Sequence, residues 1–83
     1  MVFSKNEVIE LFNRKKYIVV ETLNQNNTYY YYICEVNSDE SKLKSDFRII
    51  TTVSENNNLF IKSVKGKQAE DLELIFKEKL KID

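Results

Sequence analysis

Residues 28–36 have the sequence TYYYYICEV, and this stretch decides the class of fold. It holds four consecutive tyrosines, Ile33 and Val36, and aromatic and β-branched side chains favour the extended backbone of a strand. Three further stretches of similar character predict three more strands, at 17–23, 47–53 and 59–64. The sequence therefore predicts a sheet of four strands.

Asparagine-rich segments at 24–27 and 56–58 separate these strands in pairs. Asparagine tolerates left-handed backbone and hydrogen-bonds to its own chain, so both segments predict turns. The residues between the two pairs, 37–46, are polar apart from Leu43 and predict a loop or a short helical turn. The four strands are thus expected to form two antiparallel hairpins.

Both ends of the chain predict amphipathic helices. Ser4 and Glu7 have the spacing of a capping box and predict a helix over 5–15. After Gly66, apolar residues recur at helical spacing to about residue 81 and predict a second helix. The two apolar stripes consist of Val8, Ile9, Leu11 and Phe12, and of Ala69, Leu72, Ile75, Phe76 and Leu80.

The predicted fold is α+β, a four-stranded antiparallel sheet in α-β-β-β-β-α order with both terminal helices packed on one face. It forms a single small domain over residues 1–83. Side chains alternate across a strand, so one face collects an almost purely apolar set for the helices to cover. That set is Ile18, Val20, Tyr30, Tyr32, Cys34, Val36, Phe47, Ile49, Val53, Leu59 and Ile61. A five-residue connection in the first hairpin gives this sorting, whereas a four-residue connection exchanges the faces of 17–23.

The opposite face of the sheet is expected to stay open, because two short helices cover only one face. It presents tyrosine and arginine, which are enriched at interface hot spots, among apolar and charged neighbours. This face is the candidate partner-binding site, formed by Tyr29, Tyr31, Ile33, Arg48, Ile50 and Lys62. The alternative is that these residues only stabilise the pairing of their strands.

The composition excludes most catalytic and metal chemistry. The 83 residues include no histidine and one cysteine, so neither Ser-His nor Cys-His catalysis nor a structural zinc site can be assembled. One glycine cannot build a phosphate-binding loop. We therefore expect no enzyme, no cofactor, no metal and no small-molecule ligand. Cys34 is expected to be a small buried hydrophobe, with exposure as the alternative if the hairpin register differs.

Thirteen basic and thirteen acidic residues cancel, which disfavours nucleic acid as a partner without excluding it. The predicted function is a non-catalytic protein-binding or regulatory module that forms a homodimer through its open face. The first alternative is nucleic-acid binding by the sheet tyrosines with Lys and Arg, and the second is a structural domain with no dedicated site. A free thiol, together with no signal-like or membrane-spanning segment, predicts the cytoplasm. The richness in Lys, Asn, Ile and Tyr suggests an AT-rich coding sequence, typical of low-GC bacteria and their phages.

Overall fold

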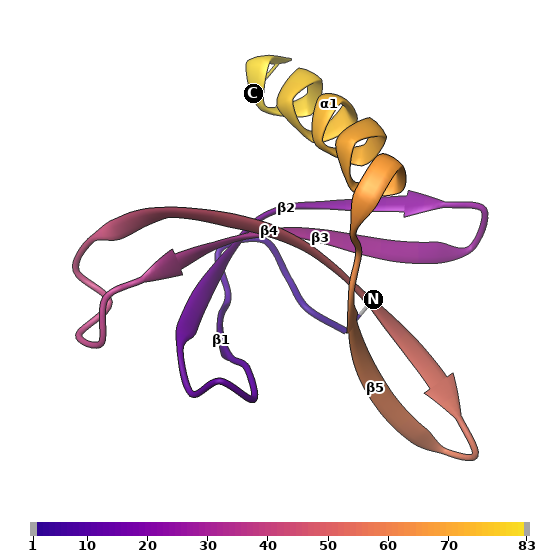
Figure 1. The fold of residues 1–83 in the computed structure, drawn as a ribbon, viewed down its shortest axis with the longest axis horizontal. Coiled ribbons are helices and arrows are strands. Elements are labelled where there is room, and N and C mark those ends of the chain that lie inside the picture. The colour runs from indigo at the N-terminus through magenta and orange to yellow at the C-terminus, as the bar shows by residue number, and fades with distance from the viewer. Residues whose placement is uncertain (1, 83) are drawn as a thin grey trace.

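The described part of the chain folds into a five-stranded antiparallel sheet followed by one helix (Figure 1). The computed structural model describes residues 2–82. The strands lie in the sheet in chain order, each paired with the next. The elements are β1 (Val8–Glu10), β2 (Lys16–Gln25), β3 (Thr28–Val36), β4 (Leu43–Glu55), β5 (Asn58–Ser63) and α1 (Gly66–Ile82).

The α+β class, the antiparallel sheet and the C-terminal helix are confirmed. The strand predicted at 28–36 has the bounds of β3, and the other three predicted strands fall within or overlap β2, β4 and β5. The predicted number of elements is wrong, because the described residues form five strands and one helix. Within residues 2–82, no helix is long and apolar enough to span a bilayer.

The predicted N-terminal helix is a turn and a short hairpin instead. Its first turn begins as expected, because the Ser4 N–H donates to Glu7 Oε1 at 2.9 Å and the Glu7 N–H donates to the Ser4 carbonyl at 3.0 Å. The chain then leaves the helical path at Asn6, whose φ is +74°. The Asn6 N–H donates to the Val19 carbonyl at 2.7 Å, and the Val19 N–H donates to the Glu7 carbonyl at 2.8 Å. An isolated helix of eleven residues is marginal, and this pairing with β2 offers long-range contacts in its place.

Two-residue turns close the β2–β3 and β4–β5 hairpins. Asn26, Asn27, Asn56 and Asn57 all have positive φ, between 51° and 67°, which is the backbone of a type I′ turn. Residues Gln25 and Thr28 are therefore paired directly, and neither the four-residue nor the five-residue connection is correct. A register shift between Val19 and Glu21 marks a bulge in β2.

Apolar clusters lie on both faces of the sheet. α1 covers one, the helix face, where Tyr32, Ile49, Leu72 and Phe76 are buried together. Figure 1 shows β1 and the N-terminal segment on the opposite side of β2–β4 from α1. We call this side the N-terminal face. Its buried cluster consists of Ile9, Tyr17, Val19, Tyr31, Ile33 and Ile50, with Phe3, Leu11, Tyr29 and Ile61 packed against it.

The prediction that one face stays open is therefore wrong. The predicted helix 5–15 was placed on the helix face, but residues 2–10 lie across the N-terminal face. The bulge in β2 and a second register shift between Cys34 and Val36 increase the local twist, and strongly twisted strands curve a sheet around one of its faces. Ile9 of β1 is part of the buried cluster on the N-terminal face, and Ile61 of β5 packs against it.

Candidate functional site

The six residues of the predicted partner-binding site lie in three different settings. Tyr31, Ile33 and Ile50 are brought together as expected, but inside the buried cluster of the N-terminal face. Tyr29 is half-buried at the margin of that cluster. The exposed tyrosine face on which the prediction rested does not exist, so these three buried side chains cannot contact a partner in this structure.

Segments from the N-terminus cover these tyrosines. The Phe3 ring packs edge-on against Tyr31, with 5.1 Å between the ring centroids and an angle of 71° between the planes. The Tyr31 hydroxyl accepts a hydrogen bond from the Val2 N–H at 3.2 Å. On β2, the Tyr17 hydroxyl accepts one from Asn13 Nδ2, also at 3.2 Å. The phenols of Tyr31 and Tyr17 therefore both have a polar partner, as is usual for a buried tyrosine.

Arg48 and Lys62 are the predicted site residues that remain exposed. The Arg48 guanidinium lies 5.5 Å from the centre of the Tyr17 ring and pairs with Asp46 at 3.2 Å. This pairing is the main cause that raises the pKa of Arg48 above its usual value. Lys62 lies on β5 opposite Thr51 of β4. The two cations lie on opposite faces of the sheet, since Arg48 is paired with Ile33 and Lys62 with Thr51, so they do not form one site with Tyr29 and Tyr31.

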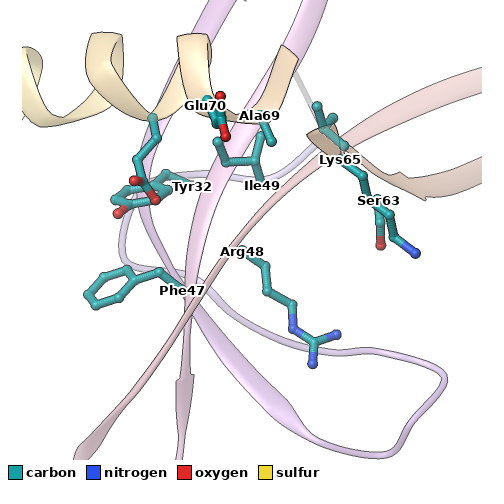
Figure 2. Close-up of a pocket in the computed structure, with 10 residues that line it drawn as sticks. Tyr32, Phe47, Arg48, Ile49, Ser63, Lys65, Ala69 and Glu70 are labelled. Atoms are coloured by element: carbon teal, nitrogen blue, oxygen red, sulfur yellow. The ribbon is translucent and has the colours of Figure 1, made fainter. Parts of the chain in front are cut away.

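A groove of about 470 Å³ lies between α1 and β4 (Figure 2). Its floor is aromatic: Tyr32 stacks between Phe76 and Phe47, with 5.2 Å between ring centroids in each pair. Figure 2 shows Ala69 and Glu70 of α1 above the groove and the Arg48 side chain pointing away from the helix. A second hollow of about 530 Å³ continues along α1 past Asp46 and Lys77, and it shares Tyr32, Phe47 and Glu73 with the first.

The groove offers apolar contact rather than reactive groups. Burial, followed by the negative charge of Glu73, raises the pKa of Tyr32 above its usual value, so its phenol stays protonated near neutral pH. The charges around the groove are balanced, since Arg48 and Lys65 line it together with Glu70 and Glu73, and Glu73 pairs with Lys77 at 3.3 Å. This balance selects no particular charge on a ligand.

Cys34 is fully buried, as predicted for a small hydrophobe. Its thiol donates to the Lys44 carbonyl at 2.9 Å. Burial raises the pKa of this thiol, and the nearby Asp46 and Glu35 carboxylates raise it further. A protonated, inaccessible thiol is a poor nucleophile. Within residues 2–82, no cluster of three or more Cys, Asp and Glu side chains could hold a metal ion.

The β4–β5 hairpin carries a different kind of surface. β5 forms the edge of the sheet, and it pairs with β4 alone among the described strands. Leu59 and Phe60 are 50% and 45% exposed on this edge strand. Its pairing with β4 is regular from Asn58 to Ser63, with no bulge. The result is a regularly paired, partly apolar edge whose outer backbone groups have no strand partner among the described residues.

A small basic cavity of about 210 Å³ lies beside the β1–β2 hairpin. Four cations, Arg14, Lys15, Lys16 and Lys44, line it with a single carboxylate, that of Glu35. The Glu35 carboxylate is mostly buried and pairs with Lys44 at 3.1 Å and with Lys15 at 3.9 Å. Phe12, in the loop of the same hairpin, is 97% exposed.

Sequence reasoning assigned Leu59 and Phe60 to strand faces but did not propose their edge strand as a binding surface. The available signal was the order of elements: a final hairpin followed by a helix leaves its last strand without a successor to pair with. Comparisons with protein-family models, with curated proteins and with solved structures give no match to this chain. We therefore infer a function from the surfaces of this fold.

Proposed function

We propose that this chain is a non-catalytic module that binds protein by accepting a partner strand along the outer side of β5. The observation that carries the proposal is the unprotected edge. Folded proteins block such edges with prolines, bulges or several charged side chains, because an open edge is a template for another strand. β5 has no proline, no bulge and one charged residue, Lys62.

The exposed side chains of β5 support the same proposal. In strand addition, backbone hydrogen bonds supply much of the affinity, and side chains of the edge strand contact the partner on each face. Leu59 and Phe60 point to opposite faces because they are adjacent in a strand. An added strand would therefore find an apolar side chain to pack against on either side.

The test compares two lysine substitutions in binding to protein partners from the native host. Phe60→Lys puts a charge on the edge strand, and Leu74→Lys is the matched control, because Leu74 is 66% exposed on α1. We expect Phe60→Lys to abolish retention of the bound partner and Leu74→Lys to preserve it.

Hydrogen exchange on the recovered complex supplies the second readout. We expect the amides of β5 to gain protection when the partner is present, because their outward N–H groups then enter a ladder. Equal retention by both variants, or unchanged exchange in β5, would contradict the proposal.

Nucleic-acid binding is the second candidate, and the basic cavity with Phe12 is the observation that favours it. Single-stranded nucleic acid binds where cations contact phosphates beside an aromatic ring that stacks on a base. Tyr31, which was expected to provide such a ring, is buried, whereas Phe12 is free to do so.

A labelled single-stranded oligonucleotide of about 16 nucleotides tests this candidate. Binding through the cavity should weaken steeply between about 50 and 200 mM salt and should weaken further in Lys44→Gln. Lys67→Gln is the control, because Lys67 is exposed and pairs with Asp71 at 2.9 Å on the first part of α1. Absent binding at low salt, or equal loss in both variants, would remove this candidate.

The setting of the protein is also a proposal. The free thiol of Cys34 supports a reducing compartment such as the cytoplasm. The composition supports a regulator encoded by a bacterium, a phage or another mobile element.

A further inference from the structure

The backbone groups that β5 leaves free follow from its pairing with β4. Glu55 and Asn58 flank a two-residue turn and form a hydrogen-bonded pair, and such pairs alternate along an antiparallel ladder. Phe60 and Lys62 therefore direct their N–H and C=O groups toward β4. Leu59, Ile61 and Ser63 direct theirs outward, to the open edge.

We propose that the strand added to β5 is β5 of a second copy of this chain, paired antiparallel in the register that places Phe60 opposite Phe60. This inference rests on the proposed function and names the partner at that same edge. Two-fold symmetry requires that residues pair around a single centre. Outward-directed residues must meet outward-directed residues, so the centre must fall on a residue rather than between two.

The side chains of β5 discriminate among the possible centres. Centring on Lys62 would oppose two like charges, and centring on Ile61 would set Phe60 against Lys62. Centring on Leu59 would leave few residues of the strand paired. Centring on Phe60 pairs it with its own copy and pairs Leu59 with Ile61 twice. Each Lys62 then faces an uncharged Asn58.

This register fits the hydrogen-bonding pattern as well. Phe60 opposite Phe60 becomes a non-hydrogen-bonded pair, the type in which the side chains lie closer together. The flanking pairs, Leu59 with Ile61 on each side, become the hydrogen-bonded ones and use the outward groups. The two half-exposed phenyl rings meet on one face of the joined sheet.

The other face of the joined sheet extends the core of each protomer. Ile61 packs against the buried cluster of the N-terminal face, and Leu59 lies on the same side of β5. In the dimer each Leu59 contacts the partner's Ile61, so its exposed surface becomes continuous with that cluster. Pairing over five residues gives a small interface, so we expect a reversible dimer seen at about 100 μM protein.

Disulfide trapping tests the register. Phe60→Cys places two Cα atoms about 4.5 Å apart across the two-fold axis, within the range that a disulfide spans. We expect a covalent dimer on oxidation of this variant. Lys62→Cys is the matched control, because in this register the two positions are offset by four residues, about 13 Å. The wild-type protein should give no covalent dimer, since Cys34 is buried.

Crosslinking of Lys62→Cys in preference to Phe60→Cys would overturn the proposed register. Sedimentation tests the association itself. We expect the wild type and Leu74→Lys to show dimer at about 100 μM, and Phe60→Lys to raise the dissociation constant at least about tenfold, because it opposes two lysines. Circular dichroism checks that the substituted proteins keep their fold.

The two proposals fail separately. A wild-type protein that stays monomeric at this concentration, with host-partner binding still lost in Phe60→Lys, overturns the second copy as partner and leaves strand addition standing. Unchanged sedimentation together with unchanged partner binding in Phe60→Lys overturns both.

Discussion

The two ends of the chain carry similar amphipathic patterns but fold differently. Residues 66–82 form α1 as the pattern predicts, whereas residues 5–15 form a turn, a three-residue strand and a hairpin loop. The C-terminal segment has seventeen residues of helix and i, i+4 ion pairs such as Lys67 with Asp71. The N-terminal segment is shorter, and its β-branched Val8 and Ile9 suit an edge strand beside β2. The conformation of a short amphipathic segment therefore depends on the element that it packs against or pairs with.

The largest loss of stability is expected from a substitution in α1. Phe76 is fully buried and stacks on Tyr32. We expect Phe76→Ala to lower the free energy of unfolding by about 3–5 kcal/mol, because it removes a buried ring and leaves a cavity. Urea unfolding measures the change, and a loss below about 1 kcal/mol would show that α1 packs loosely on the sheet.

A smaller loss is expected on the N-terminal side. Phe3 is partly buried and contacts Tyr31 through one edge. Phe3→Ala should cost about 2 kcal/mol, because less apolar surface returns to water than from a core ring. Thermal unfolding measures this loss. We also expect faster hydrogen exchange at the Ile9 amide and unchanged exchange at the amides of α1. An equal increase in α1 would show that the two ends of the chain do not respond separately.

Alkaline pH probes the helix side through Tyr32. Its pKa is raised in the folded state, above the usual 10.0, because burial and the Glu73 charge disfavour the phenolate. Unfolded chains release this proton more readily, so stability is retained below pH 10 and falls as pH rises further. The fall should be shallower in Tyr32→Phe, measured by urea unfolding from pH 9 to pH 11. Identical slopes in the two proteins would exclude Tyr32 as the cause.

The smallest effect should come from Phe12, the counterpart of Phe76 in the N-terminal pattern. Its ring is 97% exposed, so Phe12→Ala should change the free energy of unfolding by less than about 0.5 kcal/mol. The apolar stripe predicted a core position for it, which is wrong. A loss as large as that of Phe76→Ala would show that the ring packs in solution after all.

The sequence predicted the local structure of the sheet well. The tyrosine run gave β3 its bounds, and paired asparagines gave both turns, because these signals act within a few residues. The bulge in β2 and the route of residues 2–10 depend on contacts far apart in the chain, such as Asn6 with Val19. The spacing of apolar residues along the sequence does not predict such long-range contacts.

The candidate site failed for the same reason. The pattern correctly groups Tyr31, Ile33 and Ile50 on one face, but it predicts an open face, because it predicts the N-terminal segment to be a helix on the other side of the sheet. Because one element is predicted wrongly, these three side chains are predicted to be exposed although they are buried. The edge position of β5 follows from the order of the strands in the sheet. The exposure of its side chains depends on the packing of the whole fold, which the sequence pattern does not give.

The buried position of Cys34 provides a natural probe for opening of the folded structure. The single thiol lies on β3, the middle one of the five described strands, where it is buried and donates to the Lys44 carbonyl. A thiol-reactive dye can label it only after an opening motion exposes the side chain, so the labelling rate at low dye concentration measures how often the structure around Cys34 opens. Cys34 shares its face of β3 with Tyr32, which α1 covers, so the labelling rate reports opening on this face of the sheet without an introduced probe.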